Sequence, residues 1–210
     1  MTLDSFSGVK KETTWKLRPG RTAVLIVDML NDFLVEGGKM VLPGGHRIVP
    51  YQKQLIRAGR KAGFPIIYIN DAHRPGLKVD REFLKRGQHC IEGTWGAQVI
   101  DSLTPEPEDL IVIKRRFSGF YETDLDLTLK DSGIDTLIVM GVVTNICVRS
   151  TIHDAFFRGY QVIVPRDCVE ATGPREQESS LYDVETHFGE VTDSAAILQA
   201  IKELQGQIDK

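Results

Sequence analysis

Long apolar runs and an excess of basic residues are both missing from this 210-residue sequence. No apolar stretch approaches the roughly 18 residues that a membrane-spanning helix requires. The first residues, Met1 to Phe6, lack the charged and apolar regions of a signal peptide. The formal net charge of -3 gives no basic footprint for a nucleic acid. We therefore expect neither a membrane nor a nucleic acid as a partner.

Cysteine is also scarce. The chain has three cysteines, Cys90, Cys147 and Cys168, an odd number without close pairing. This spacing argues against a disulfide framework and for a reducing compartment, so we expect a cytoplasmic protein.

The remaining composition is that of an ordinary globular protein, with 41% apolar and 26% charged residues. The length suits one domain with a full hydrophobic core. Residues 1–20 are polar and end in Pro19-Gly20, which indicates an N-terminal arm. We predict that residues 21–210 form a single domain.

Short apolar, β-branched runs alternate with helical patterns along this domain. Five runs are predicted to be strands covered on both faces, and five amphipathic stretches are predicted to be helices. The strands are 23–27, 65–69, 110–113, 136–140 and 160–164, and the helices are 46–62, 125–132, 147–158, 179–187 and 195–204. This alternation predicts the α/β class: a doubly wound, mainly parallel sheet flanked by helices in three layers.

Chemically reactive side chains follow several of these strands. Ligands of open α/β sheets bind outside the carboxyl ends of the strands. Asp28 follows the first strand, Asn70, Asp71 and His73 the second, and Lys114 the third, while Cys147 follows the fourth. A carboxylate, an ammonium and a thiol are therefore expected at one edge of the sheet.

Cys147 is predicted to be the nucleophile, although a lone cysteine is more often a small core residue. At the start of the helix over 147–158, the helix dipole and free backbone N–H groups would favour its thiolate. Asp28 could accept the thiol proton, Lys114 could stabilise negative charge, and backbone N–H groups could form an oxyanion hole. His153 lies six residues further on and points to a different face of the helix, as a surface or interface histidine does.

Three motifs resemble those of the isochorismatase-like cysteine hydrolases, over residues 22–198. They are Val27-Asp28-Met29-Leu30-Asn31-Asp32-Phe33, Ile113-Lys114-Arg115-Arg116-Phe117-Ser118-Gly119-Phe120 and Gly141-Val142-Val143-Thr144-Asn145-Ile146-Cys147-Val148. The resemblance implies a catalytic triad of Asp28, Lys114 and Cys147. It implies an oxyanion hole from the backbone N–H groups of Val143 and Cys147, with a cis peptide at Val142-Val143 or Val143-Thr144. It also implies a homo-oligomer, either a dimer or a tetramer.

A second resemblance concerns metal binding. Asp71, His73 and His89 are similar to the residues that hold a divalent metal in nicotinamidases. The resemblance implies a zinc site here, although the chemistry of Cys147 requires no cofactor. Two imidazoles and a carboxylate suit zinc. The alternative is structural, with Asp71 capping a turn and His89 packed in a loop.

Four further residues are predicted to bind the substrate: Phe33, Asn70, Phe117 and Phe120. For the aromatic residues, a plain core position is the alternative, because such side chains bury a large area.

The leading hypothesis is a cysteine hydrolase that cleaves a linear carbon–nitrogen bond of a small carboxamide or ureide through a thioester and releases ammonia. It would be similar to N-carbamoylsarcosine amidase or to biuret and ureide hydrolases. Nicotinamidase is the alternative within the family. A ligand-binding module without turnover, or a redox sensor acting through Cys147, is the alternative of another class.

Overall fold

The computed structural model describes residues 14–77 and 79–208. Most of the predicted N-terminal arm, residues 1–13, lies outside the described residues. In the remainder of that arm, Leu17 is buried and Arg18 donates a hydrogen bond to Asp135, 2.6 Å away. None of the helices in the described part of the chain is both long and apolar enough to cross a membrane.

The chain forms one mainly parallel sheet in the order β3-β2-β1-β4-β5-β7, with the short β6 paired to β4. Each pairing between these strands is parallel. The strands are β1 (Thr22–Val27), β2 (Ile66–Asp71), β3 (Leu110–Lys114), β4 (Thr136–Val142), β5 (Gln161–Pro165), β6 (Val169–Glu170) and β7 (Glu190–Thr192). The predicted α/β fold is confirmed.

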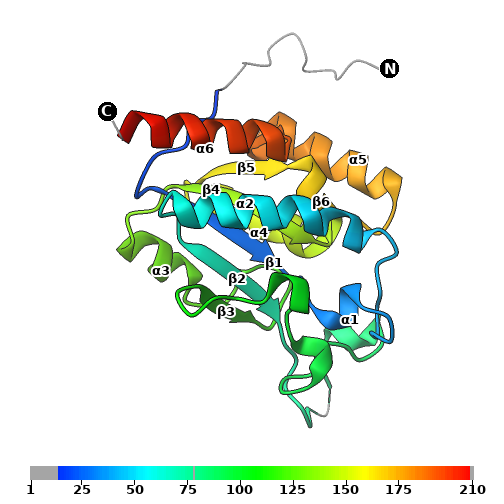
Figure 1. Cartoon of the computed structure of the whole chain (residues 1–210). Coiled ribbons are helices and arrows are strands. Elements are labelled where there is room, and N and C mark those ends of the chain that lie inside the picture. Colours follow the sequence, from blue (N-terminus) through cyan, green and yellow to red (C-terminus); the bar gives the residue numbers. More distant parts are fainter. Residues whose placement is uncertain (1–13, 78, 209–210) are drawn as a thin grey trace.

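Helices cover both faces of this sheet. The order reverses at β1, so right-handed crossovers place α2 on one face and α3 and α4 on the other. The C-terminal α6 packs beside α2, in front of the sheet in Figure 1. The helices are α1 (Asn31–Leu34), α2 (Val49–Lys61), α3 (Leu125–Asp131), α4 (Arg149–Phe157), α5 (Pro174–Asp183) and α6 (Ser194–Ile208). Shorter helical turns are η2 (Gly45–Ile48), η3 (Glu82–Leu84), η4 (Trp95–Ala97), η5 (Asp101–Leu103), η6 (Thr144–Val148), η7 (Arg166–Cys168) and η8 (Val184–Phe188).

One predicted helix begins earlier in the structure than the sequence pattern indicated. The prediction was 179–187, whereas α5 begins at Pro174 and continues into the wider turn η8. Proline is well suited to the first turn of a helix, where its missing N–H would have no partner in any case. The short strands β6 and β7 were not predicted, because two or three residues carry no periodic signal.

The expectation that every strand is covered on both faces is wrong for β3. Leu110, Ile111 and Ile113 are 41%, 54% and 41% exposed, and only Val112 and Lys114 are buried. β3 forms the edge of the sheet, so its outer residues have no neighbouring strand and little helical cover.

The long segment between β2 and β3 lies beneath the carboxyl ends of the strands, together with α1 (Figure 1). An isolated antiparallel bridge between Leu30 and Val99 joins these two regions. The loops that follow β1 and β2 therefore meet at the edge where the reactive side chains were predicted.

Candidate active site

Asp28 lies at the first turn after β1. Its backbone has a φ of 53°, its N–H donates to the carbonyl of Ile69, and its Oδ1 accepts the N–H of Asp71 at 2.7 Å. The side chain is fully buried. These bonds to β2 hold the carboxylate at the carboxyl edge of the sheet, aimed away from solvent.

Sheet register brings Lys114 to this carboxylate. Residue 114 is the register partner of Asp71, which places it at the end of β3 beside the ends of β2 and β1. Its Nζ lies 2.9 Å from Asp28 Oδ2, 3.6 Å from Asp71 Oδ1 and 3.6 Å from Cys147 Sγ. Lys114 is fully buried, so the ammonium has two carboxylates and one sulfur as its close charged or polarisable neighbours.

Cys147 follows the tight turn after β4. The peptide bond between Val142 and Val143 is cis, which agrees with one of the two positions that the family resemblance implied. The chain then makes the wide helical turn η6, which contains Cys147, before α4 begins at Arg149. Thr151 stabilises this turn. Its hydroxyl donates a hydrogen bond to the carbonyl of Cys147 at 2.8 Å and accepts one from the N–H of Gly119 at 3.0 Å.

Gly141 allows this turn to lie against β1. It has a φ of 127°, and a Cβ atom there would lie 2.0 Å from the carbonyl oxygen of Val27. Only glycine fits such a close approach without moving one of the two central strands.

Burial and the charges of their neighbours shift the pKa of all three groups. It raises the pKa of Asp28 above its usual range, and the charge of Lys114 opposes this shift only in part. Burial would lower the pKa of Lys114, but the charges of Asp28, Cys147 and Asp71 outweigh it and raise that pKa. Burial also raises the pKa of Cys147, against the effect of Lys114. The raised pKa favours a protonated thiol at Cys147 over the thiolate that its position near a helix start predicted, because burial disfavours the charged form.

A second cluster adjoins these residues. Asp71, His73 and His89 lie together as predicted, and Glu82 joins them; one ligand atom from each lies within 4.8 Å of the others. Asp71 Oδ2 is 3.1 Å from His73 Nε2 and 3.6 Å from His89 Nε2, and Glu82 Oε2 is 3.8 Å from His73 Nε2. Because Asp71 Oδ1 faces Lys114, this one carboxylate links the two groups of residues.

The outer nitrogen of each imidazole is held by another group. His73 Nδ1 contacts Asp80 Oδ2 at 2.7 Å, and His89 Nδ1 donates to the carbonyl of Gly87 at 2.8 Å. Both Nε2 atoms consequently face Asp71. In metal sites, the second ring nitrogen of a ligating histidine is almost always bonded to a carboxylate or carbonyl in this way. The donor set and its supports therefore fit a divalent metal such as zinc.

Backbone pairing holds the two parts of this cluster together. The N–H of His73 donates to the carbonyl of Cys90, and the N–H of Glu92 donates to the carbonyl of His73. Asp32 anchors the same segment, since its carboxylate accepts the N–H of Cys90 at 2.6 Å and that of Lys39 at 3.0 Å.

The histidines and carboxylates of this cluster shift each other's pKa. Burial would lower the pKa of His73, but hydrogen bonds and charge from Asp71 and Asp80 outweigh it and raise the pKa to about 9. The pKa of Asp71 is correspondingly lowered, because Lys114 and the two histidines outweigh its burial. These opposite shifts favour a positively charged imidazole at His73 beside an ionised carboxylate at Asp71.

The four predicted substrate-binding residues are placed differently from one another. Phe33 lies against His89, with ring centroids 5.6 Å apart, and Phe117 is 44% exposed. Asn70 is buried, and its Oδ1 accepts no hydrogen bond from the residues that the structure describes. Phe120 is buried against Tyr160, with Arg158 over its ring, which fits the alternative of a plain core position.

Sequence reasoning missed Glu82, Asp80 and Asp32. The two carboxylates at 80 and 82 lie inside the long loop between the predicted ligands, and their presence there was a usable signal. Asp32 lies in a motif that was singled out, but its role depends on contacts with residues 39 and 90, which no local pattern reveals.

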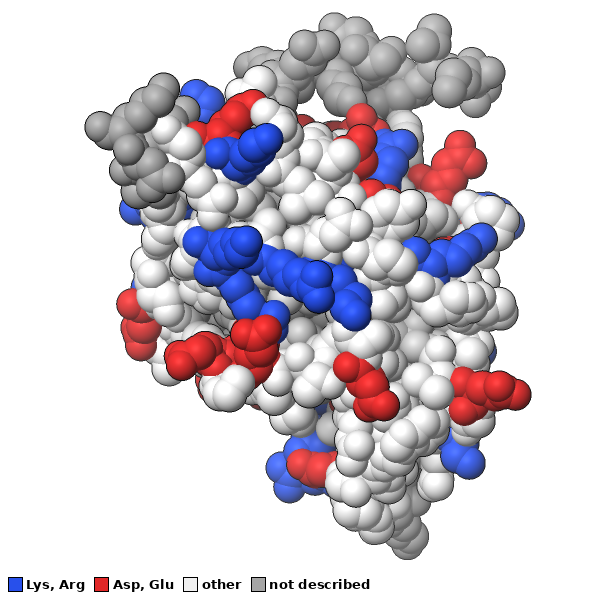
Figure 2. Space-filling view, in the orientation of Figure 1, with Lys and Arg blue, Asp and Glu red and all other residues white. Residues whose placement is uncertain are grey.

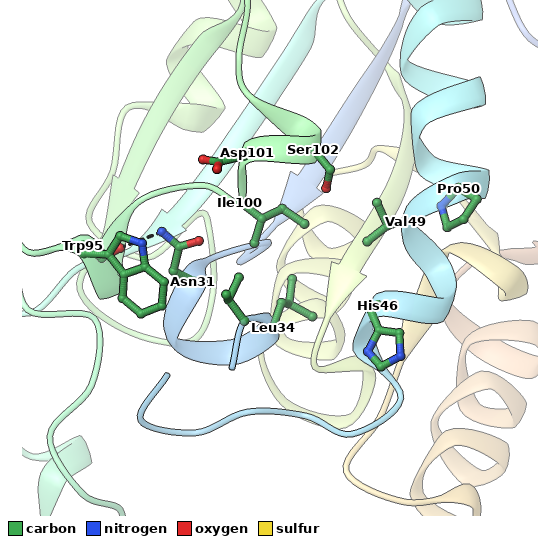
Figure 3. A pocket seen from close by; sticks show the side chains of 10 residues that line it. Asn31, Leu34, His46, Val49, Pro50, Trp95, Ile100, Asp101 and Ser102 are labelled. Carbon is green, nitrogen blue, oxygen red and sulfur yellow. Dashed lines mark hydrogen bonds between the residues drawn. The ribbon is translucent and has the colours of Figure 1, made fainter. Parts of the chain in front are cut away.

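A separate cavity of about 450 Å³ opens beside α1, and Figure 3 shows the side chains around it. Its wall combines apolar side chains with a few polar ones and includes none of the residues predicted to act on substrate. The lining residues are Asn31, Leu34, Val35, His46, Val49, Pro50, Trp95, Ile100, Asp101 and Ser102.

Residues 22–196 match the model of the isochorismatase domain. This match covers most of the chain, including Asp28, Lys114 and Cys147. The chain belongs to the isochorismatase family. The family prediction made from the three motifs is confirmed.

Relatives within the isochorismatase family include hydrolases of small nitrogen compounds. The chain is 35% identical to ureidoacrylate amidohydrolase RutB of Methylorubrum extorquens, over 86% of this chain and 82% of that protein. Among solved structures, a cysteine hydrolase from Pseudomonas syringae pv. phaseolicola matches with a TM-score of 0.86 and 32% identity, over 92% of this chain and 98% of that one.

Two further structures of the family bear on the site. N-carbamoylsarcosine amidase from Thermoplasma acidophilum matches with a TM-score of 0.75 and 35% identity, over 83% of this chain and 96% of that one. A pyrazinamidase of Pyrococcus horikoshii, solved in complex with zinc, matches with a TM-score of 0.76 and 31% identity, over 82% of this chain and 99% of that one.

Proposed function

We propose that this protein hydrolyses a linear carbon–nitrogen bond of a small carboxamide or ureide, with Cys147 as nucleophile. It is an amidohydrolase acting on bonds other than peptide bonds, as its relatives RutB and N-carbamoylsarcosine amidase are. The observation that carries the proposal is the contact of Lys114 Nζ with both Asp28 Oδ2, at 2.9 Å, and Cys147 Sγ, at 3.6 Å.

The proposed reaction begins with a neutral thiol. Because burial raises the pKa of both Asp28 and Cys147, the carboxylate can take the thiol proton as the sulfur attacks the carbonyl carbon. Lys114 keeps its proton and balances the negative charge that moves between the two groups. The thiolate therefore forms only when the substrate carbonyl is in place to accept it.

The tetrahedral oxyanion would accept hydrogen bonds from the backbone N–H groups of Val143 and Cys147. Asp28 then returns the proton to the departing nitrogen, which leaves as ammonia while the thioester forms. Water, deprotonated by the same carboxylate, attacks the thioester, and the proton returns to sulfur as the acid departs. Asn70 Oδ1 is buried and has no hydrogen-bond donor within residues 14–77 and 79–208, so it is suited to accept an N–H of the substrate.

We also propose that Asp71, His73, Glu82 and His89 hold a divalent metal, with zinc as the best fit. When bound, the ion would polarise a water or a donor atom of the substrate. The chain's own part is to present two imidazole nitrogens and two carboxylates, oriented by Asp80 and the carbonyl of Gly87. This cluster favours the second candidate function, nicotinamidase, because a pyrazinamidase relative is known with zinc.

Substitution of Cys147 tests the proposed reaction. We expect Cys147→Ala to abolish ammonia release from a panel of nicotinamide, N-carbamoylsarcosine, biuret and ureidoacrylate, while the circular dichroism spectrum stays unchanged. Cys168→Ala, at another buried free cysteine, is the matched control and should retain turnover. Mass spectrometry of acid-quenched wild type should detect the acyl adduct on Cys147. Full activity in Cys147→Ala would contradict the proposal.

Metal content tests the cluster independently of turnover. Protein purified without added zinc should contain about one equivalent of metal, and calorimetric titration of the metal-free form should show one zinc site. Glu82→Gln and His89→Asn should weaken zinc binding by about 10- to 100-fold or more. Equal zinc affinity in these variants and the wild type would contradict the assignment.

A reducing compartment such as the cytoplasm suits this chemistry, because Cys147 must remain a free thiol. The redox-sensor alternative needs a resolving thiol, and burial raises the pKa of both Cys90 and Cys168 above the usual range. Rapid alkylation of Cys147 that substrate analogues block would favour the enzyme over a redox sensor.

A further inference from the structure

Asp32 is a buried carboxylate that the proposed reaction does not use. Charged side chains are common at the surface, where Figure 2 shows acidic and basic groups, among them a basic band over α2. Asp32 is only 4% exposed, and it forms no ion pair with any residue in the described parts of the chain. Because a carboxylate is costly to bury without partners, its hydrogen bonds show what it does in the fold.

Each oxygen of Asp32 accepts a backbone N–H from a different loop. Oδ1 accepts that of Lys39 at 3.0 Å, in the glycine-rich loop after α1, and Oδ2 accepts that of Cys90 at 2.6 Å, in the segment that carries His89. Gly96 packs against the same carboxylate so closely that a Cβ atom there would collide with it. One side chain thus joins three stretches of backbone that follow β1 and β2.

The residue that Asp32 holds lies between two of the proposed metal ligands. Cys90 directly follows His89, and its carbonyl accepts the N–H of His73 at 2.8 Å. Its φ of 46° is a left-handed conformation that residues with a side chain rarely adopt, and it persists only where the surroundings enforce it. The bond from Cys90 to Asp32 therefore helps to fix how far the imidazole of His89 stands from that of His73.

We propose that Asp32 is a positioning residue for the zinc site and couples that site to the glycine-rich loop of residues 35–44. This inference rests on the zinc site proposed above. Zinc orders the segment that carries His89, and the bonds of Cys90 and of the loop to one carboxylate extend this order to the loop. Coupling of this kind is reciprocal, so the anchored loop also strengthens zinc binding.

Asp167 is a matched carboxylate with a purely structural role. Its oxygens accept the N–H and the hydroxyl of Ser194 at the start of α6. It follows β5, which is three strands away from β2 in the sheet, so it does not touch the segment that carries His89. Asp167→Asn therefore makes the same chemical change as Asp32→Asn, but outside the proposed connection.

Calorimetric titration of the metal-free full chain with zinc tests the positioning role. Both oxygens of Asp32 accept N–H groups, so in Asp32→Asn the new amide N–H₂ faces one of these donors. We expect this variant to raise the dissociation constant for zinc by about 10- to 100-fold, as loss of an outer partner of a metal ligand does. Asp167→Asn should leave the constant unchanged.

Hydrogen exchange followed by mass spectrometry tests the coupling without any turnover. In the wild type, added zinc should slow exchange in peptides that cover residues 87–92 and also in peptides that cover residues 35–44. In Asp32→Asn with saturating zinc, the protection should be confined to residues 87–92, because the connection to the loop is broken.

Circular dichroism shows whether Asp32→Asn is folded, and Gly96→Ala, whose added methyl group displaces the carboxylate, replaces it if it is not. A wild type without a zinc site overturns the metal proposal and this inference together. Zinc affinity that the Asp32 or Gly96 variant leaves unchanged, or that Asp167→Asn lowers as much, overturns this inference alone. Zinc protection that does not reach residues 35–44 in the wild type does the same.

Discussion

Both ends of the parallel sheet carry ion pairs, but the two ends differ in solvent access. At the amino end, Asp135 precedes β4 and binds Arg18 and Arg21, whose side chains are 43% and 55% exposed. At the carboxyl end, Asp28 and Lys114 are fully buried. Burial raises the pKa of Asp28, whereas at Asp135 the arginines and Thr136 outweigh burial and lower the pKa.

This difference separates a stabilising carboxylate from a reactive one. A carboxylate that faces water keeps its hydration, and each nearby cation stabilises its ionised form slightly. It therefore stays ionised over a wide pH range. A carboxylate deprived of water depends on one buried ammonium and is therefore ready to accept a proton. The same pair of residue types thus supports the fold at one end of the sheet and proton transfer at the other.

Removal of the buried ammonium should have the largest effect. Lys114→Met leaves Asp28 buried without a cation and leaves Asp71 with only the histidines beside it, so we expect a loss of about 3–5 kcal/mol in the free energy of unfolding. Ammonia release should fall to background in the same variant. Urea unfolding and the substrate panel measure the two effects. If the free energy of unfolding of this variant is within about 1 kcal/mol of the wild-type value, the buried ion pair contributes no more to stability than a surface ion pair does, which would contradict this expectation.

Gly133 and Gly141 both have a positive φ and lie at opposite ends of β4, so substituting each by alanine compares the two ends of this strand. Gly141 at the carboxyl end would place a Cβ atom 2.0 Å from the carbonyl oxygen of Val27, whereas a Cβ atom on Gly133, before the strand, meets nothing within 4 Å. We expect Gly141→Ala to cost at least about 1–3 kcal/mol more than Gly133→Ala, because only the former forces strands apart. Thermal unfolding of both variants checks this, and equal costs would contradict it.

The hydroxyl of Thr151 offers a smaller perturbation of the carboxyl end. Thr151→Val keeps the shape of the side chain but leaves the N–H of Gly119 and the carbonyl of Cys147 without this partner. We expect a loss of about 1–3 kcal/mol. Turnover should drop about tenfold or more, since the sulfur loses a support of its position. Thr186→Val, at an exposed hydroxyl in η8, is the control and should change neither quantity appreciably.

The smallest effect is expected at the amino end. Asp135→Asn should lower stability at neutral pH by about 1 kcal/mol, because both arginines are largely exposed. The pKa of Asp135 is lowered in the folded state. The contribution of this carboxylate to the free energy of unfolding is therefore complete above the usual pKa of 3.8, and it is lost as the pH falls below that value. Urea unfolding should therefore separate variant and wild type at pH 7 and bring them together in acid. A difference that persists in acid would contradict the assignment.

The sequence predicted the sheet, most of its helices and the meeting of Asp28, Lys114 and Cys147. These predictions succeeded because buried strands can be recognised in the sequence as apolar runs, and because the carboxyl ends of parallel strands lie at one edge of the sheet. It did not predict Asp80 or Glu82, because they meet His73 within one long loop that has no periodic pattern. It did not predict Asp32 either, because its partner Cys90 lies on a distant segment. The role of Phe120 stays a prediction for a related reason: aromatic side chains near a site pack into the core as readily as they line a pocket.

The amino-acid sequence by itself determined which residues stand at the carboxyl edge of the sheet and in which order. Tertiary structure decided their charge state and their neighbours. Register between β2 and β3 placed Lys114 beside Asp71 as well as Asp28, and burial raised the pKa of the Cys147 thiol. Local sequence carries strand order and helix periodicity, whereas solvation and contacts between loops exist only once distant segments have packed together.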